Sequence, residues 1–175
     1  MKSIFAKLIL LALFVASCSK VSENELWTKV EQARNHQNYD STIQLCKKIL
    51  EEYPDGQRAP AALYSLAEAY QNGSHDFKAA VSSYSLFTQQ YPNDTLAPAT
   101  LFLIGFIYNN DLQMYDSARV AYNRFLMMYP NHDLAPSARF ELANLGKNPE
   151  ELLPPAYAPD AKETKTAMRN KKHVH

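Results

Sequence analysis

The chain has 175 residues, 46% of them hydrophobic, which is enough to fill the core of one domain of ordinary size. Eighteen basic and eighteen acidic side chains cancel to a formal charge of zero, so no overall field favours nucleic acid as a partner. The four glycines lie far apart, so no glycine-rich loop can hold a phosphate. Composition therefore excludes a disordered chain and gives no support to nucleotide or nucleic-acid binding.

The first seventeen residues have the pattern of a secretory signal. Lys2 and Lys7 precede an apolar run of nine residues, 8–16, which is about half the length that a helix needs to cross a bilayer. Ser17 and Cys18 follow the run. We therefore predict that residues 1–17 are a signal peptide and that residues 18–22 are a tether.

The segment Val15-Ala16-Ser17-Cys18 resembles the lipobox of bacterial lipoproteins, in which the chain is cut before a cysteine that receives acyl chains. The resemblance implies that Cys18 is lipidated and that the lipid alone anchors the protein to a membrane. Ser19 stands where an aspartate would retain a lipoprotein at the inner membrane, which implies the outer membrane, facing the periplasm. The alternative is a signal peptide cut nearby that leaves Cys18 as a thiol.

Internal repetition at a fixed interval dominates the rest of the sequence. Tyr-Pro pairs begin at positions 53, 91 and 129, and Ala-Pro pairs at 59, 97 and 135, so the interval is 38 in both series. Aromatic-led segments at 39–42, 77–80 and 115–118 keep the same interval. The period predicts repeats at about 23–58, 59–96 and 97–134, then a capping helix at 135–153 within a repeat domain of 23–153, and a disordered basic tail at 154–175.

Each unit is predicted to be two antiparallel helices. In the second unit Leu63, Leu66 and Tyr70 recur at three- and four-residue intervals, which is one face of a helix. Gly73 is expected to take the left-handed conformation that ends this helix, and Pro92 ends the next one. The expected fold class is therefore all-α, an α-solenoid of antiparallel helical hairpins.

These hairpins resemble the tetratricopeptide repeat, whose first helix carries an apolar residue, a small residue and an aromatic one three positions later. Leu66-Ala67 with Tyr70 and Ile104-Gly105 with Tyr108 match that pattern. The common repeat has about 34 residues. The repeat in this chain has four more, one in the turn inside the repeat and three at the end of the second helix. The longer form is similar to repeats of envelope lipoproteins, such as the one that assists β-barrel assembly, and of the periplasmic partner of the Tol–Pal system.

Small and aromatic residues at equivalent positions are expected to form the packed core of the stack. Cys46 aligns with two of the tyrosines and is expected to be a buried hydrophobic residue, and Trp27 is expected to cover an exposed end. The predicted core positions are Ala67, Gly105, Ala143, Ala80, Ala118, Tyr84 and Tyr122.

We find no residue pattern typical of an enzyme or a metal site. No two of the five histidines are spaced four apart on one predicted helix, and there is no Cys-x-x-Cys. Adjacent carboxylates such as Glu51 and Glu52 point about 100° apart on a helix, so they cannot act as an acid and base pair. The prediction is a protein without catalytic residues, metal or cofactor.

The resemblance implies a peptide-binding groove lined by the first helices. Tyr64, Phe102 and Phe140 recur at the repeat interval as an aromatic ladder, Phe106 belongs to a second row, and Asn72 and Asn110 supply amides. We expect this groove to bind apolar side chains of a partner. The alternative is that the rings only pack on adjacent helices.

The predicted function is a non-catalytic scaffold, anchored by lipid in the outer membrane, that recruits another envelope protein and takes part in envelope assembly. Two alternatives stay open: a structural lipoprotein that assembles into homo-oligomers, and an accessory subunit of an envelope enzyme or transporter. The last sixteen residues carry five basic and two acidic side chains, and their attraction to anionic partners is modest.

Overall fold

The computed structural model describes residues 20–147. The predicted signal peptide, Cys18, the basic tail and the end of the predicted capping helix lie outside the described residues. The chain divides into two compact units, one ending at Ser74 and the other beginning at His75. Each unit is described by itself.

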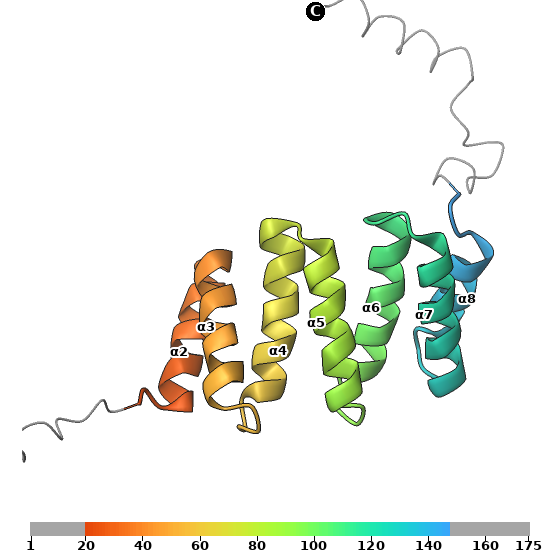
Figure 1. Ribbon diagram of the computed structural model, residues 1–175. Helices are drawn as coiled ribbons and strands as arrows, with labels where there is room; N and C mark the ends of the chain where they lie inside the picture. Colours follow the sequence, from red (N-terminus) through yellow and green to blue (C-terminus); the bar gives the residue numbers. More distant parts are fainter. Residues whose placement is uncertain (1–19, 148–175) are drawn as a thin grey trace, which may run out of the picture. The chain divides into compact units, whose positions relative to one another are not determined.

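Among residues 20–74, which are the described part of the first unit, there are three α-helices and a π-helical turn (Figure 1). They are α2 (Glu23–Asn35), α3 (Tyr39–Glu52), α4 (Ala59–Ala69) and η2 (Tyr70–Ser74). The side chains of Ser22 and Asn38 cap α2 and α3 by accepting hydrogen bonds from backbone N–H groups in the first turn. The helices pack in chain order, α2 on α3 and α3 on α4.

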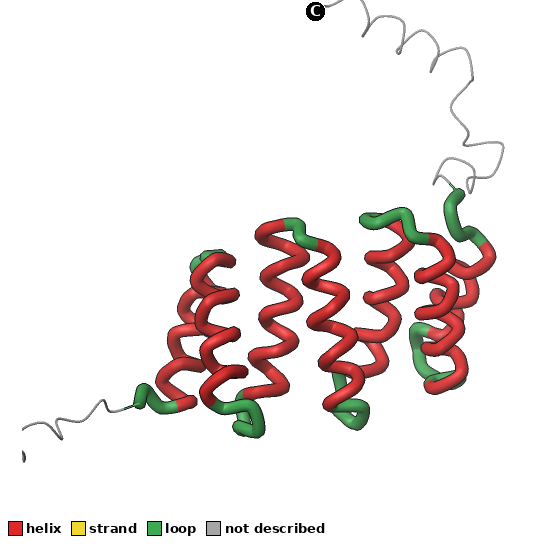
Figure 2. The backbone as a smooth tube through the Cα atoms, viewed as in Figure 1, coloured by secondary structure: helices red, strands yellow, loops and turns green. Residues whose placement is uncertain are grey.

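The described part of the second unit, residues 75–147, has four α-helices, which also pack in chain order. They are α5 (Phe77–Gln90), α6 (Ala97–Asn110), α7 (Tyr115–Met128) and α8 (Ala135–Ala143). Pro98 and Pro136 lie in the first turns of α6 and α8, where the missing N–H costs little. Short loops join the helices, and the described residues include no strand (Figure 2). The predicted all-α fold of tetratricopeptide-like helical hairpins is confirmed.

Trp27 and Cys46 lie in the core of the first unit. Both belong to one cluster of buried side chains, and the indole Nε1 of Trp27 donates a hydrogen bond of 2.9 Å to Glu31 Oε1. The expectation that Trp27 covers an exposed end is therefore wrong. Burial raises the pKa of the Cys46 thiol to about 12, so this residue is a small buried hydrophobic group. The cluster comprises Leu26, Trp27, Val30, Cys46, Ile49, Ala62 and Leu66.

The small residues at equivalent repeat positions lie where helices approach closely. Gly105 shows the constraint most clearly, because a Cβ atom there would lie 2.7 Å from the ring of Tyr122. Ala143 differs: it is exposed at the end of α8, the last helix of the described residues, so its assignment to the core is wrong. The other predicted core positions are buried: Ala67, Gly105, Ala80, Ala118, Tyr84 and Tyr122.

The turn inside each repeat uses a residue other than glycine in the left-handed conformation. Gln37, His75 and Gln113 occupy equivalent repeat positions and have φ angles of 53°, 51° and 52°. The expectation that Gly73 takes this role is wrong, because Gly73 still belongs to η2. The π-helical turn holds one additional residue, and the left-handed position follows it at His75, two residues beyond Gly73.

The segment before α2 is packed on the end of α3. Lys20 donates a hydrogen bond of 2.7 Å to the backbone oxygen of Glu52, and its ammonium lies 4.2 Å from the ring centroid of Tyr53. The hydroxyl of Tyr53 donates a hydrogen bond of 2.7 Å to the backbone oxygen of Val21. Residues 20–22 therefore belong to the folded unit, and the prediction that they form part of a tether is corrected.

Candidate peptide-binding cavity

A polar cavity of 510 Å³ opens between α2 and α4 in the first unit. The C-terminal half of α2 forms one wall, α4 and η2 form the other, and the start of α3 contributes Tyr39 and Thr42. Because α2 and α4 are the first helices of consecutive repeats, this is the kind of surface expected to bind a peptide. The lining residues are Glu31, Arg34, Asn35, Tyr39, Thr42, Ser65, Glu68, Ala69 and Asn72.

An ion pair crosses the cavity from one wall to the other. Arg34 Nη2 lies 2.9 Å from Glu68 Oε2, and both side chains are partly exposed. Burial raises the pKa of Glu68, and the positive charge of Arg34 opposes that rise. An exposed pair of this kind contributes at most about 1 kcal/mol to folding. Both charged groups nevertheless line the cavity, where a bound ligand can contact them.

Two asparagines face this cavity at equivalent positions. Asn72 was predicted as a binding residue from the sequence, whereas Asn35 was missed. The reason is an offset: the first helix of repeat one aligns with that of repeat two at an interval of 37, because its turn lacks the additional residue. When the repeats are aligned by their Tyr-Pro pairs, Asn35 does not match Asn72. When the first helices are aligned by placing Val30 on Ala67, Asn35 becomes the equivalent of Asn72 and Asn110.

The residues of the predicted aromatic ladder differ in their surroundings within each unit. Tyr64 is half-buried on α4 and does not line the cavity. In the second unit the ring centroid of Phe102 lies 5.5 Å from that of Tyr122, so this ring packs on α7 as the alternative interpretation states. Phe106 and Phe140 are exposed, Phe140 to 55% of its surface.

Amide groups also occupy the region between α6 and α8 in the second unit. Asn109 donates a hydrogen bond of 3.3 Å to Glu141 Oε2 and accepts one of 3.4 Å from the N–H of Gly146. The predicted residue Asn110 is exposed and donates to the backbone oxygen of Phe106 at 3.0 Å. Asn109 therefore links α8 to α6.

Within residues 20–147, none of the helices is long and apolar enough to cross a membrane. In the same part of the chain, no three histidine, cysteine, aspartate or glutamate side chains are grouped closely enough to hold a metal ion.

The tetratricopeptide repeat family model matches residues 61–94 and 99–132. Four residues, 95–98, separate the two matches. No curated protein matches the chain. The two matches support a tetratricopeptide-repeat protein. Such repeats mediate binding to other proteins and are typically non-catalytic, which supports an interaction scaffold with a protein partner.

Proposed function

We propose that this protein is a lipid-anchored scaffold of the bacterial outer membrane that recruits another envelope protein. In this proposal an extended segment of the partner lies in the cavity between α2 and α4. The observation that carries the proposal is the pair of asparagines, Asn35 and Asn72, that two consecutive repeats place in one cavity.

The chemistry of the cavity suits a peptide backbone. Each asparagine amide offers two donors and one acceptor, as does no other neutral side chain except glutamine, and can pair with both the N–H and C=O groups of a partner. Glu31, Arg34 and Glu68 add charges of both signs to the walls. The volume of 510 Å³ lies within the usual range for ligand pockets, about 300–1,000 Å³. These features favour a polar, extended segment over an apolar small molecule.

The packed segment 20–22 supports the anchoring part of the proposal. Cys18 precedes Lys20 by two positions, so a lipid attached there starts within about 7 Å of Lys20 along the backbone. Lys20 is held against Tyr53 and Glu52 at the end of α3. A lipidated Cys18 would therefore keep this end of the first unit close to the membrane surface.

Replacement of Cys18 by serine in the full chain tests the anchor. We expect Cys18→Ser to abolish incorporation of labelled palmitate and to move the protein out of the outer-membrane fraction. Cys46→Ala is the matched control, because Cys46 is buried and has no place in the anchor. Unchanged fractionation and labelling of Cys18→Ser would overturn the lipoprotein assignment.

Replacement of both asparagines tests the cavity. We expect Asn35→Ala with Asn72→Ala to reduce partner capture in intact cells at least tenfold, with the midpoint of thermal unfolding unchanged. Gln44→Ala, an exposed position on α3, is the control and should leave capture unchanged. Equal capture by the double variant and the control would overturn the assignment of the cavity.

A further inference from the structure

The outer face of α7 departs from the pattern of the other repeats. The second helices α3, α5 and α7 align residue by residue at the interval of 38. At four aligned positions the first two repeats have a polar residue and the third has an apolar one. These triplets are Asn38, Asp76 and Met114; Gln44, Ser82 and Val120; Glu51, Gln89 and Met127; and Glu52, Gln90 and Met128.

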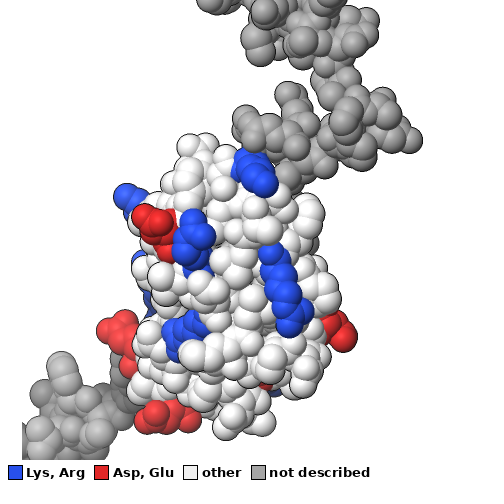
Figure 3. All heavy atoms as spheres, turned by 90° about the vertical axis from the view of Figure 1, so that its right-hand side faces the viewer, with Lys and Arg blue, Asp and Glu red and all other residues white. Residues whose placement is uncertain are grey.

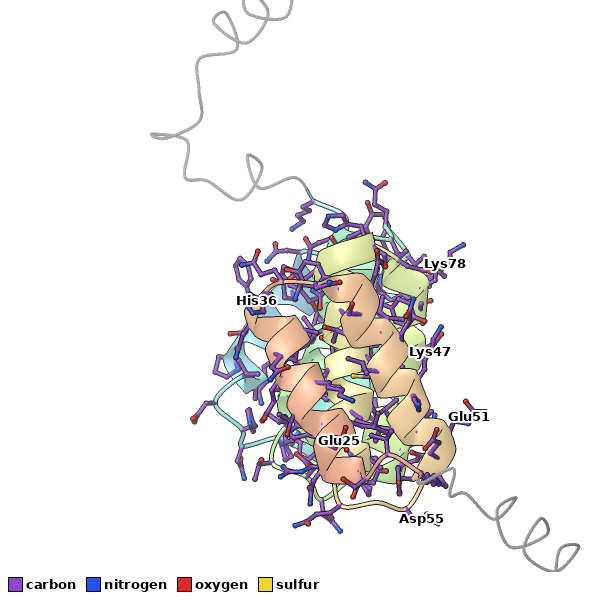
Figure 4. The ribbon with its side chains drawn as sticks, turned by 90° about the vertical axis from the view of Figure 1, so that its left-hand side faces the viewer. Glu25, His36, Lys47, Glu51, Asp55 and Lys78 are labelled. Atoms are coloured by element: carbon purple, nitrogen blue, oxygen red, sulfur yellow. The ribbon has the colours of Figure 1, made fainter. Side chains whose placement is uncertain are left out.

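The apolar side chains at these positions are exposed. Val120 exposes 68% of its surface and Met127 exposes 77%. The polar residues aligned with them are exposed too, and Figure 4 shows Glu51 pointing away from α3 into solvent. The positions of Val120 and Met127 therefore face solvent in every repeat, and packing of the fold gives no reason for an apolar residue at either. The position of Met128 differs, because the aligned Glu52 is half-buried.

Met114 lacks the helix-capping hydrogen bond that the aligned residues of the other repeats make. The aligned side chains of Asn38 and Asp76 each accept a hydrogen bond of 3.0 Å that caps α3 and α5. Met114 has no such side-chain hydrogen bond, although it occupies the N-cap position of α7. All three methionines of residues 20–147 lie at or on α7 and are exposed. Flexible, polarisable methionines are typical of surfaces that adapt to a partner.

An apolar groove of 380 Å³ runs beside this face, between α5 and α7. Its floor is formed by Leu101 and Ile104 of α6, and Val120 and Ala121 line the α7 side. On α7 the lining residues step along the helix at intervals of three or four, so the groove follows the axis of α7. Its shape therefore fits a helix lying alongside α7.

Opposite charges mark the two ends of the groove. Asp116 and Arg124 both line it and are eight residues apart on α7, a separation of about 12 Å. Among the described residues neither side chain forms an ion pair; the three ion pairs found there all lie in the first unit. Figure 3, which views the side where α7 and α8 lie, shows basic side chains set in a largely uncharged surface.

We propose that this groove binds an amphipathic helix of a partner protein, at a site separate from the cavity of the first unit. The apolar ridge of the helix packs on Leu101, Ile104 and Val120, and Met127 extends the contact. A carboxylate of the helix pairs with Arg124 and a cation about two turns away pairs with Asp116. The two charges set the direction in which the helix binds.

A designed peptide tests this proposal. The probe is an 18-residue labelled helix with leucines at intervals of three and four, and with a glutamate and a lysine eight residues apart in the order that matches Arg124 and Asp116. A second peptide has these two charges exchanged. In both peptides the leucines are arranged to fit the groove in one direction only. Fluorescence anisotropy with the full chain should show at least tenfold tighter binding of the matched peptide.

Two variants and one control decide the outcome. Val120→Gln with Met127→Gln restores the polar pattern of the other repeats and should weaken binding of the matched peptide at least tenfold. Asp116→Lys with Arg124→Glu should reverse the preference between the two peptides, which also shows that this variant is folded. Asn35→Ala with Asn72→Ala should change nothing, so failure of the cavity and failure of this groove are distinguishable.

Three results would overturn the proposal. The first is equal binding of the two peptides by the unaltered chain. The second is unchanged binding by the variant with Val120→Gln and Met127→Gln. The third is self-association of the chain without peptide that this variant abolishes in sedimentation, because the occupant of the groove would then be a second copy.

Discussion

The guanidinium of Arg34 lies 2.9 Å from the carboxylate of Glu68 and joins the first helices of two consecutive repeats. The pair stands in the cavity that we assign to a partner peptide. Burial raises the pKa of Glu68 while Arg34 opposes this rise, so removal of the arginine leaves a carboxylate whose charged form is disfavoured. The ionisation of Glu68 in this cavity therefore contributes to the pH dependence of the free energy of unfolding.

Arg34→Gln should make the protein less stable as pH rises from about 4 to 7. A carboxyl group whose folded pKa lies above its unfolded value stabilises the fold below the unfolded pKa, and that stability is lost as pH rises through the folded pKa. Loss of Arg34 raises the folded pKa of Glu68 further. Urea unfolding at several pH values measures the slope, and adding Glu68→Gln should remove the additional slope. Parallel profiles for Arg34→Gln and the unaltered protein would contradict this account.

Gly105→Ala should destabilise the second unit despite the better helix propensity of alanine. The gain from propensity is about 1 kcal/mol, whereas a new Cβ atom 2.7 Å from the Tyr122 ring forces a shift. Overpacking of this kind costs about 1–3 kcal/mol. Chemical unfolding measures the change. In a double-mutant cycle with Tyr122→Leu, the cost of Gly105→Ala should shrink, and an unchanged cost would show that the ring is not the obstacle.

Tyr122→Phe should leave stability unchanged or raise it by about 1 kcal/mol. The Tyr122 hydroxyl is buried and has no hydrogen-bond partner among the described residues, so its removal relieves an unsatisfied group. Tyr53→Phe is the matched control, because the Tyr53 hydroxyl donates to the backbone oxygen of Val21 at 2.7 Å. That control should lose about 1 kcal/mol. Equal losses in the two variants would mean that the Tyr122 hydroxyl is satisfied.

Phe102→Ala and Phe140→Ala should behave differently although both belong to one repeat position. The Phe102 ring centroid lies 5.5 Å from that of Tyr122 and 6.0 Å from that of Phe125, so its removal should cost about 3 kcal/mol. Phe140 is 55% exposed, and its removal should change stability by less than about 0.5 kcal/mol. Thermal unfolding monitored by circular dichroism separates the two. A similar loss in both variants would show that Phe140 is also packed.

The helical hairpins could be predicted because side chains at equivalent positions repeat at a fixed interval. Periodicity could not reveal how deeply each ring is packed. Phe102 and Phe140 therefore received the same assignment, although Phe102 packs on the Tyr122 ring of α7 and Phe140 is 55% exposed. A fixed interval of 38 also hid Asn35, because one residue fewer in the first turn shifts its helix.

Local backbone geometry explains the remaining errors. Glycine is the usual residue at a left-handed position, yet His75 takes it because η2 extends through Gly73. Ala143 shares a repeat position with Ala67, which is buried, but Ala143 is exposed. The sequence period predicts the repeat position of a residue and does not predict whether another helix packs on it.

A photoreactive side chain at position 72 tests the central claim most directly. With p-benzoylphenylalanine in place of Asn72 in the full chain, ultraviolet irradiation of intact cells should join the protein to one segment of one envelope protein. The same side chain at position 35 should reach that same segment, and the side chain at position 44 on the outer face of α3 should not. Attachment from position 44 alone, or from all three positions equally, would contradict recruitment through the cavity between α2 and α4.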